Sequence, residues 1–391
     1  MIVNIKEKLV MFHETDFNQK LFEGEIPLEH GMSYNSYLFL DEKTCLLDTS
    51  AREVKETFFE ELNESLDGRE LDYIVIHHIE PDHTASIRDI IKKYPNAQIY
   101  ISMMGSVFFK NFFPDLSHLK FNIIKEGDTL PLGSHTLRFI SAPMVHWPEV
   151  MMSYEENHQI LFSADAFGSF VTAPNPYERN YENKAFLLSE SRRYFTNVIS
   201  KYASSVLSLV TKIKNLPIKM ILSLHGLVHE QNISTLFSWY GKWCTHTPEE
   251  DGVLILYASI YGHTKEAALY LEKGLQARGI KTIIHTLNIV DVSYALSDSF
   301  IYSKIILLAP TFNVGLYPKM EIYLRTLIEH GVQNKHFYII ENGSWAPQAK
   351  ELMKKYIDEL SNCTIDPLSL TIKSALKQTD YPILDDIIKN V

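Results

Sequence analysis

The stretch His78-Ile79-Glu80-Pro81-Asp82-His83 places two imidazoles and two carboxylates within six residues. It follows the apolar run 71–76, whose β-branched and aromatic residues are typical of a buried strand covered on both faces. The next segment, 84–91, has its apolar residues at helical spacing. The six residues therefore form a strand-to-helix turn, in which a rigid frame holds side chains that converge on one point. Four possible ligands on one short turn favour a pair of metal ions over a single ion.

Further residues of ligand type follow downstream, each close to the end of an expected strand. They are His146 after 137–140, Asp165 at the end of 160–164, and His225 at the end of 219–224. A lone histidine at a strand end is usually a hydrogen-bonded structural residue, and the turn 78–83 taken alone could be a solvated polar loop. The joint pattern of four histidines and three carboxylates instead predicts a dinuclear nitrogen and oxygen site, with Asp165 as the bridge.

Composition and charge narrow the class of protein. The 391 residues suffice for two or three domains, and 46% hydrophobic with 22% charged residues is ordinary for a globular protein. The net charge of −11 and the lack of a Lys/Arg-rich run argue against a nucleic-acid partner. Residues 1–8 lack the apolar core of a signal peptide, and no later stretch is long enough to span a membrane, so we expect a cytoplasmic protein.

Cysteine usage limits the metal chemistry. Cys45, Cys244 and Cys363 lie far apart, and no two of them form a C-x-x-C pair. A disulfide framework, a thiolate zinc site and an iron–sulfur cluster are therefore not favoured. Any bound metal must be held by nitrogen and oxygen.

The first half of the chain mixes short strands with helices, which predicts a layered α/β sandwich. We expect strands at 34–40 and 45–48 joined by a turn at 41–43, a helix at 54–66, further strands at 98–101, 137–140 and 160–162, and a closing helix at 226–245. The polar segment 245–252 contains Pro and Gly and lacks periodicity, so it is the best linker candidate. It divides the chain into domains 1–248 and 253–391.

The second half begins with a strand, 253–258, followed by a loop rich in small and hydroxyl residues and by a helix at 265–277. The loop is Ser259-Ile260-Tyr261-Gly262-His263-Thr264. Backbone N–H groups, hydroxyls and the helix dipole favour a phosphate in such a loop, although similar loops also serve as simple helix caps. There is no G-x-G-x-x-G and no Walker lysine, so dinucleotide and triphosphate sites are not favoured.

Two further loops follow strands in this half. The strand 304–309 leads into Pro310-Thr311-Phe312-Asn313-Val314-Gly315-Leu316-Tyr317, and the strand 336–340 leads into Glu341-Asn342-Gly343-Ser344-Trp345-Ala346-Pro347. Doubly wound sheets bind ligands outside the carboxyl ends of strands near the switch point of the topology. A last strand at 368–372 and a last helix at 383–388 complete a five-stranded pattern. Phe312 and Trp345 are candidate neighbours of a bound ring, with simple core packing as the alternative.

The ligand order His-x-Glu-x-Asp-His, followed by His146, Asp165 and His225, resembles the flavodiiron proteins, and the loop 259–264 resembles the FMN phosphate loop of flavodoxins. This resemblance implies a metallo-β-lactamase-like αββα sandwich followed by a flavodoxin-like, doubly wound, parallel five-stranded sheet. Glu80 is the discriminating position, because hydrolytic members of the metallo-β-lactamase superfamily usually carry His there and hold a zinc pair. A carboxylate adds anionic oxygen, which favours iron.

The resemblance also implies the role of each ligand. His78, Glu80 and His146 would hold one iron and Asp82, His83 and His225 the other, with Asp165 bridging the two. FMN would be held by the loop 259–264 and by two further sets of residues: Pro310, Thr311, Phe312, Asn313 and Gly315, and Asn342, Gly343, Ser344, Trp345 and Ala346. The third loop departs from the Gly-Ser-Tyr-Gly-Trp type that many family members carry. Backbone contacts to the flavin ring should survive this change, while its effect on the flavin potential is left open.

By the same resemblance, the protein reduces O2 to water, NO to N2O, or both, at a non-haem diiron site supplied with electrons by FMN. The family implies an external electron donor, either a rubredoxin-like protein or a reduced deazaflavin, and a head-to-tail homodimer or a dimer of such dimers. With no rubredoxin or flavin-reductase module expected after residue 391, the chain would have the minimal two-domain form. Glu80 argues against one rival, a dinuclear zinc hydrolase fused to a flavodoxin-like domain. The seven-residue ligand set argues against another, a pure electron carrier.

Three other histidines are expected to stay outside the ligand set. His77 would point away from His78, toward the core or toward an outer hydrogen bond. His229 is expected at the surface. His30 is a candidate for the mouth of the site, because it lies just before the strand 34–40.

Overall fold

The computed structural model describes residues 1–391, and its internal contacts divide the chain into two compact units, 1–238 and 239–391. The helix α7 (Ile233–Cys244) contains the division between them. Every helix falls short of the length and apolar character that a membrane crossing requires.

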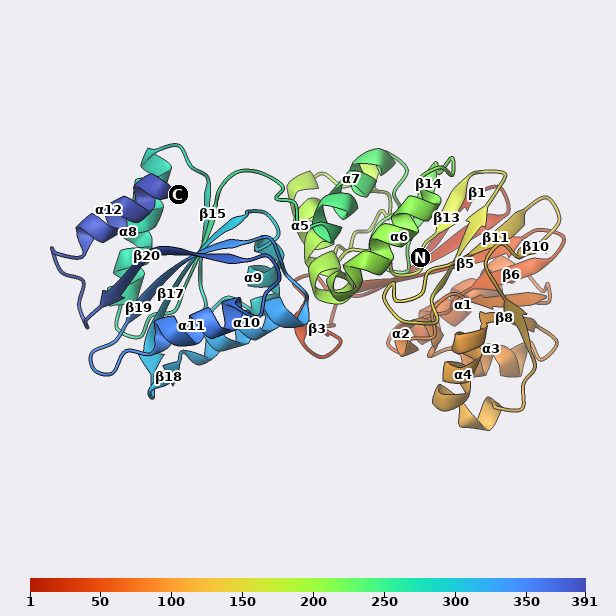
Figure 1. Ribbon diagram of the computed structural model, residues 1–391. Helices are drawn as coiled ribbons and strands as arrows, with labels where there is room; N and C mark the ends of the chain where they lie inside the picture. Colours follow the sequence, from red (N-terminus) through yellow and green to blue (C-terminus); the bar gives the residue numbers. More distant parts are fainter. The chain divides into compact units, whose positions relative to one another are not determined.

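The first unit contains two sheets (Figure 1). The first has seven strands, in the order β1 (Ile2–Lys6), β2 (Leu9–Asp16), β5 (Met32–Leu40), β6 (Thr44–Leu47), β7 (Tyr73–Ile76), β8 (Gln98–Ser102) and β9 (Phe121–Ile124). The second has five, in the order β10 (Thr129–Pro131), β11 (Thr136–Ser141), β12 (Met151–Glu155), β13 (Ile160–Phe162) and β14 (Met220–Leu222). Tyr37 and Phe39 of β5 contact Phe162 of β13 at ring-centroid distances of 5.1 and 5.7 Å. The two sheets therefore pack face to face.

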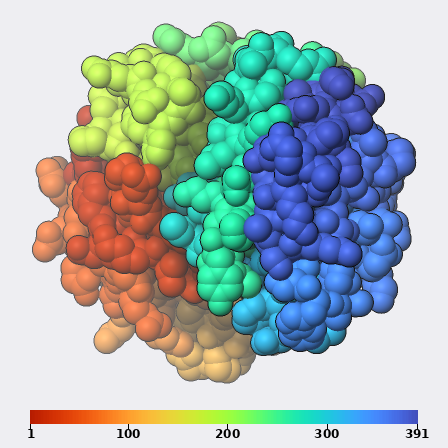
Figure 2. Space-filling view, turned by 90° about the vertical axis from the view of Figure 1, so that its left-hand side faces the viewer, coloured from red at the N-terminus to blue at the C-terminus, as the bar shows by residue number.

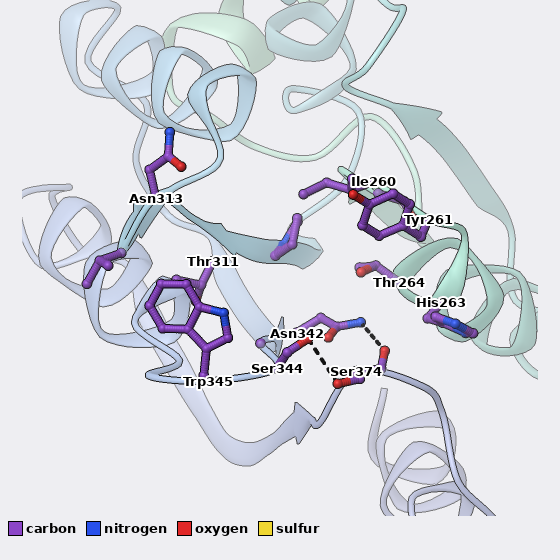
Figure 3. A pocket seen from close by; sticks show the side chains of 14 residues that line it. Ile260, Tyr261, His263, Thr264, Thr311, Asn313, Asn342, Ser344, Trp345 and Ser374 are labelled. Atoms are coloured by element: carbon purple, nitrogen blue, oxygen red, sulfur yellow. Dashed lines mark hydrogen bonds between the residues drawn. The ribbon is translucent and has the colours of Figure 1, made fainter.

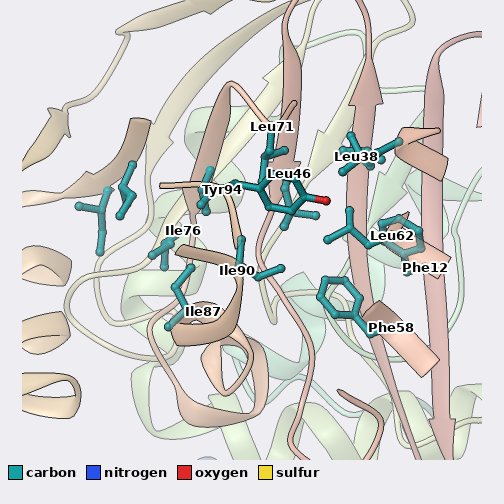
Figure 4. Close-up of a cluster of buried hydrophobic side chains, with 14 of the residues drawn as sticks. Phe12, Leu38, Leu46, Phe58, Leu62, Leu71, Ile76, Ile87, Ile90 and Tyr94 are labelled. Carbon is teal, nitrogen blue, oxygen red and sulfur yellow. The ribbon is translucent and has the colours of Figure 1, made fainter. Parts of the chain in front are cut away.

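Helices cover the outer faces of both sheets. Leu38 of β5 points away from the second sheet, opposite to its neighbours Tyr37 and Phe39, and belongs to a buried apolar cluster (Figure 4). The cluster takes Phe58 and Leu62 from α1 (Lys55–Leu66), Ile87 and Ile90 from α3 (Ile87–Lys93), and Phe109 from α4 (Met103–Phe112). On the other side, α6 (Ala203–Ile213) contacts the second sheet through Lys212, whose Nζ lies 2.9 Å from the carbonyl oxygen of Ser141. Figure 1 shows α5 (Lys184–Tyr194), α6 and α7 grouped away from α3 and α4, as an αββα sandwich requires.

Strand direction brings the expected ligand positions together. The neighbouring strands β6, β7, β8 and β9 are all parallel, so their carboxyl ends lie at one edge of the first sheet. In the second sheet β13 and β14 are also parallel, with Phe162 opposite Leu222. The residues that follow these two strands, which include Asp165 and His225, therefore leave the second sheet side by side.

The expected helix over 226–245 is wrong in its first part, because α7 begins only at Ile233. The N–H of Val228 donates to the carbonyl oxygen of Pro176 (2.7 Å), and the N–H of His229 donates to that of Ile221 (3.1 Å). These residues pair with neighbouring chain segments and so cannot form helical hydrogen bonds. The expected helix over 84–91 is likewise divided, into α2 (Pro81–Thr84) and α3.

The second unit is a doubly wound parallel sheet. Its five parallel strands follow the order β16 (Thr282–Thr286), β15 (Val253–Tyr257), β17 (Lys304–Phe312), β19 (His336–Asn342) and β20 (Thr364–Ile372). The short strand β18 (Gly315–Leu316) turns back antiparallel on β17. This order, 2-1-3-4-5 in chain sequence, places the switch point between the ends of β15 and β17.

Helices lie on both faces of this sheet. The helices α8 (His263–Ala277) and α12 (Tyr381–Asn390) share one buried cluster with the strands, and Figure 2 shows the dark blue C-terminal segment beside the teal segment of α8. The other helices are α9 (Val292–Asp298), α10 (Pro318–Glu329) and α11 (Ala349–Ile357). Buried Met320 and Leu324 of α10 and Met353 of α11 supply their apolar contacts. The central strands β15 and β17 are nearly continuous apolar runs because both of their faces are covered.

A buried histidine in the second unit makes stability depend on pH. His246 is 2% exposed, its ring contacts Phe300, and its Nδ1 has no hydrogen-bond partner. Burial, aided by the positive charge of Lys335, lowers the pKa of His246 from 6.5 to about 4. Because the folded-state pKa lies below the unfolded-state value, this contribution to stability is complete above pH 6.5 and is lost as the pH falls through 4.

We therefore expect the free energy of unfolding to fall by up to about 3 kcal/mol between these two pH values on account of His246. The matched variant is His246→Asn, since asparagine tolerates the left-handed φ of 51° at this position. Urea unfolding followed by circular dichroism at a series of pH values should give a flatter profile for the variant. Parallel profiles for the two proteins would contradict this assignment.

Candidate metal centre and cofactor pocket

The ligand turn is fixed by its own backbone. The helix α2 begins directly after Glu80, so Asp82 and His83 project from its first turn. The Oγ1 of Thr84 lies 3.0 Å from the carbonyl oxygen of Ile79 and 2.9 Å from that of Glu80, and donates to this pair. The turn therefore presents its side chains from a rigid frame at the end of β7.

The first metal group consists of His78, Glu80, His146 and Asp165. The Oε2 of Glu80 lies 2.9 Å from Nε2 of His78 and 3.2 Å from Nε2 of His146. The Oδ2 of Asp165 lies 3.1 Å from Nε2 of His146 and 3.5 Å from Nε2 of His78. Ligands bonded to one ion at about 2.0–2.2 Å are spaced about 3 Å apart, so these four side chains are positioned around a common point.

The second metal group consists of Asp82, His83 and His225. Nε2 of His225 lies 3.2 Å from Oδ2 of Asp82, and Nε2 of His83 lies 3.5 Å from Oδ1 of the same carboxylate. The remaining oxygen of Asp165, Oδ1, lies 3.2 Å from Nε2 of His83 and 3.8 Å from Nε2 of His225. One oxygen of Asp165 therefore faces each group, as expected of a carboxylate that bridges two ions.

The unsatisfied polar atoms at this centre fit metal ions. Nε2 of His83 and of His225, together with Oδ1 of Asp82 and of Asp165, are buried and have no hydrogen-bond partner. Buried polar atoms without partners are costly, and here they converge with the other ligand atoms on the same two points. Nitrogen and carboxylate oxygen are the donor set of first-row transition metals such as iron. The seven residues predicted from the sequence are all brought together.

The histidines and carboxylates of the centre shift one another's pKa values. Burial alone would lower the pKa of His83, but the carboxylates of Asp82 and Asp165 raise it to about 9. Burial likewise opposes protonation of His146, whereas Asp165 and Glu80 raise its pKa to about 9. Burial would favour a neutral Asp165, yet the nearby imidazoles hold its pKa well below the usual range. The buried carboxylates thus require positive charge beside them, which bound cations would provide.

Residues outside the ligand set orient the imidazoles. Nδ1 of His78 donates to Oε1 of the buried Glu149 (2.7 Å), and Nδ1 of His225 donates to the carbonyl oxygen of Ser33 (2.9 Å). These bonds fix the tautomers that leave Nε2 free to bind a metal. Glu149 was missed in the sequence, because its partner His78 lies 71 residues away in the chain and no local pattern signals the contact. The carbonyl of Ser33 gives no signal of this kind.

The three other histidines have different surroundings. Nδ1 of His77 donates to Oδ2 of Asp48 (2.6 Å), and its Nε2 accepts from Oγ of Ser153 (2.9 Å), away from the metal groups. The expectation for His229 is wrong: this side chain is buried, because it bonds Glu178 and the carbonyl oxygen of Phe167. His30 is exposed and its ring contacts that of Phe186 at 5.7 Å.

A cavity of about 550 Å³ reaches Asp82 from the surface, and its lining includes Tyr34 and Leu21. The rings of Tyr34 and of Phe22, which belongs to the hairpin β3 (Leu21–Phe22) and β4 (Ile26–Pro27), each pack edge-on against His225 at 5.4 Å. Desolvation and the negative charges of Glu80 and Asp165 raise the pKa of Glu23 in the same hairpin. The hairpin thus places an apolar ring against His225 of the second metal group and an acidic group near Glu80 of the first.

The second unit holds a pocket of about 450 Å³ at the switch point of its sheet (Figure 3). Twelve of the predicted cofactor residues line it: Ser259, Ile260, Tyr261, His263, Thr264, Pro310, Thr311, Asn313, Asn342, Gly343, Ser344 and Trp345. Val314 and Ser374 line it as well, and neither was among the cofactor residues predicted from the sequence. The remaining predicted residues, Gly262, Phe312, Gly315 and Ala346, lie in the same loops but not in the lining.

The phosphate-type loop has a defined backbone. The Oγ of Ser259 accepts the N–H of Gly262 (3.1 Å) and that of Lys265 (3.3 Å). Gly262 has φ of 95°, a conformation that favours glycine, and α8 begins at the next residue. Tyr261 and Trp345, which are 90% and 70% exposed, leave their ring faces free at the pocket, so Trp345 is not a core aromatic.

Thr311 connects two of the pocket loops. Its Oγ1 accepts the N–H of Gln348 (2.8 Å) and that of Ala349 (3.1 Å), which holds the loop 343–347 against the end of β17. We expect Thr311→Val to weaken binding of FMN, the expected ligand of this pocket, by up to about 30-fold, because about 1 kcal/mol is lost for each of these two hydrogen bonds. Fluorescence titration of the flavin-free protein measures this. The control Thr326→Val removes only an exposed bond to Ile322 within α10, and a similar loss of affinity there would contradict the role given to Thr311.

Comparison with known proteins finds relatives that match this chain along most of its length. Residues 32–226 match the family model described as ODP family beta lactamase. The chain is 28% identical over 382 residues to an uncharacterized protein of Methanocaldococcus jannaschii, covering 97% of this chain and 95% of that protein. It is 28% identical over 385 residues to the anaerobic nitric oxide reductase flavorubredoxin of Shigella dysenteriae, covering 96% and 78%.

Solved structures extend the likeness to the whole fold. The rubredoxin oxygen:oxidoreductase of Desulfovibrio gigas superposes with a TM-score of 0.92 at 23% identity, covering 100% of this chain and 97% of that one. A flavoprotein of Thermotoga maritima gives a TM-score of 0.91 at 23% identity, with the same coverage. The metallo-β-lactamase-like and flavodoxin-like folds are thereby confirmed in one chain. With the Glu80-containing ligand set and the relatives matched along its length, this chain belongs to the flavodiiron protein family.

Proposed function

We propose that this protein is an oxidoreductase that reduces O2 to water, NO to N2O, or both, at a diiron centre that receives electrons from FMN. The observation that carries the proposal is the carboxylate of Glu80 between His78 and His146, where hydrolases of this fold class would place an imidazole. Carboxylate oxygen at this position favours iron over zinc. The names of relatives, a nitric oxide reductase and an oxygen:oxidoreductase, support the same activity.

The residues described above would hold both cofactors. The first and second metal groups would each hold one iron, with Asp165 bridging, and the pocket at the switch point would hold FMN. When bound, these groups supply electrons, four for the reduction of O2 to two waters and two for the reduction of two NO to N2O and water. Glu149 and the carbonyl of Ser33 keep Nε2 of His78 and of His225 directed at the metal groups. Phe22 and Tyr34 exclude water around His225.

The test is consumption of O2 and of NO, in separate electrode runs, by iron-loaded protein with FMN and a chemically reduced donor. Fast loss of O2 with slow loss of NO marks an oxygen reductase, and the reverse marks an NO reductase. Turnover of neither gas, with FMN and two irons confirmed in the sample, would overturn the proposal. The zinc hydrolase would then be tested as the zinc-loaded protein with ester and thioester substrates.

Domain organisation supports a proposal about assembly. We propose a metal-binding domain, 1–248, and an FMN-binding domain, 253–391, joined by a short linker. A short linker restricts how one chain can bring its own flavin to its own metals, so we propose a head-to-tail homodimer, or a dimer of such dimers, in which electrons pass between subunits. An external donor, a rubredoxin-like protein or a reduced deazaflavin, would supply them. Sedimentation during turnover tests the assembly, and an active monomer would contradict it.

A further inference from the structure

A third cluster of ligand-type side chains lies at the rim of the second sheet, apart from the seven residues of the metal centre. His135 comes directly before β11, Glu155 is the last residue of β12, and His158 lies in the turn between β12 and β13. One possible ligand atom from each of the three lies within 4.8 Å of the others. The antiparallel pairing of Leu137 with Glu155 and of Glu155 with Ile160 holds these positions together.

His135 is held in one tautomer. Its side chain is buried, and its Nδ1 lies 2.8 Å from Oδ2 of Asp41, to which it donates. The other nitrogen, Nε2, is then an acceptor, and it is buried without a hydrogen-bond partner. An imidazole that gives one N–H to a carboxylate and presents its free nitrogen to a common point has the arrangement of a metal-ligating histidine.

The carboxylate behind His135 already has its positive partner. Nζ of Lys8 lies 2.8 Å from Oδ1 of Asp41, and Oγ of Ser134 donates to Oδ2 (2.7 Å). Burial opposes ionisation of Asp41, but these bonds outweigh it and hold its pKa well below the usual range. Lys8 balances the charge of Asp41, and the bond from His135 to the same carboxylate fixes the orientation of its ring.

Glu155 and His158 complete the donor set. Glu155 is fully buried, and its oxygens accept the N–H groups of Asn157 (3.0 Å) and His158 (2.7 Å). A carboxylate has about four acceptor sites, so these two bonds leave others free. Nδ1 of His158 lies 3.3 Å from Oε2 of Glu155 without forming a hydrogen bond, and the two imidazole rings stack at 5.3 Å.

The backbone N–H groups that Glu155 accepts in the turn explain why its carboxylate lies there. They do not explain why two imidazole nitrogens lack hydrogen-bond partners. Nε2 of His135 and Nδ1 of His158 are both buried and unpartnered, and the cluster to which they belong includes the carboxylate of Glu155. Two imidazoles and one carboxylate form a common zinc donor set, and bonds of about 2.0–2.1 Å would place neighbouring ligands about 3.3 Å apart. The pair formed by His158 and Glu155 already has this spacing.

We propose that His135, Glu155 and His158 bind a divalent transition-metal ion of the zinc class, separately from the dinuclear centre. His158 is partly exposed, which leaves a coordination position on its side open to water. The ion would clamp the turn between β12 and β13 to the start of β11. Through Asp41 it would also be connected to the turn after β5. The site is independent of the proposed reaction, because no residue is shared with either metal group.

The experiment uses protein already loaded with iron and FMN. Zn²⁺ alone is titrated against a chromophoric chelator, and iron content is measured before and after. We expect one further equivalent of Zn²⁺ to bind without loss of iron, and Co²⁺ at the same site to give the intense visible absorption of a four-coordinate ion. His158→Ala should weaken this binding by at least about 10- to 100-fold while leaving iron and FMN content unchanged.

Two further variants make the result decisive. Glu155→Gln keeps an oxygen for one backbone N–H but removes the charge, and it should also weaken binding of Zn²⁺. His118→Ala removes an exposed histidine elsewhere in the same unit and should bind as the unmodified protein does. The proposal is overturned if Zn²⁺ enters only as iron leaves, if no further equivalent binds, or if His158→Ala binds Zn²⁺ as tightly as His118→Ala.

Discussion

Asp165→Asn is expected to reduce turnover of O2 or NO at least about 100-fold and to lower the iron content from two ions toward one. Each carboxylate oxygen of Asp165 faces a different metal group, Oδ2 toward His146 and Oδ1 toward His83. An amide of the same shape has one oxygen, so only one group would keep its ligand. It also removes the negative charge that two neighbouring cations would share.

The fold itself should survive this change because the substitution is isosteric. FMN content, measured from the flavin absorbance, should be unchanged, since the flavin pocket lies in the other compact unit. The matched control is Asp115→Asn, which changes an exposed carboxylate that pairs only with Arg88 at the surface. Asp165→Asn protein with two irons and full turnover would contradict the bridging role.

Gly226→Ala is expected to lower the free energy of unfolding by about 3 kcal/mol and to displace His225. Gly226 has φ of 80°, and an added Cβ would lie 2.3 Å from Oγ of Ser169 and 2.9 Å from its backbone nitrogen. The residue cannot easily shift, because its N–H donates to Oγ of Ser33 (2.8 Å) and its carbonyl accepts from Asn35 (3.1 Å). Strain and overpacking therefore act together next to a metal ligand.

Gly127→Ala separates these two effects. Gly127 has nearly the same φ, 82°, but an added Cβ would meet no atom within 4 Å, so only the backbone strain of about 1–2 kcal/mol remains. Urea unfolding of the metal-free proteins measures both variants, and metal content after reconstitution reports on His225. Equal destabilisation by the two substitutions would contradict the steric argument.

The sequence was most informative where a strand and the residue after it could be recognised together. Asp165 and His225 could be assigned because each follows a short apolar run, and parallel strands bring such positions to one edge. Glu149 and Ser33 could not, because their role depends on which imidazole lies opposite them after folding. His229 was misplaced for a related reason, since its partner Glu178 lies 51 residues away in the chain.

The second unit shows the same difference between residues that could be predicted from the sequence and residues that could not. The loops after β15, β17 and β19 were predictable as a pocket, because alternating strands and helices predict a doubly wound sheet, which binds ligands outside the carboxyl ends of its strands. Ser374 was not, because it enters the lining only through its bonds to Asn342 and Ser344 (Figure 3). Periodicity predicts which residues lie at strand ends, whereas cross-loop hydrogen bonds require the folded chain.

The origin of the ligands has a consequence for the lifetime of the protein. The turn 78–83 extends from the first sheet, whereas His146, Asp165 and His225 extend from the second. Two ions bound by these residues would link the first sheet to the second. Their binding energy would add to the free energy of unfolding. A chain without metal keeps its sheets together by apolar contacts and by hydrogen bonds such as those from Tyr37 to the carbonyl oxygen of Ser223 and from Ser153 to His77. The metal supply during synthesis therefore sets not only how many molecules are active but also how many escape proteolysis.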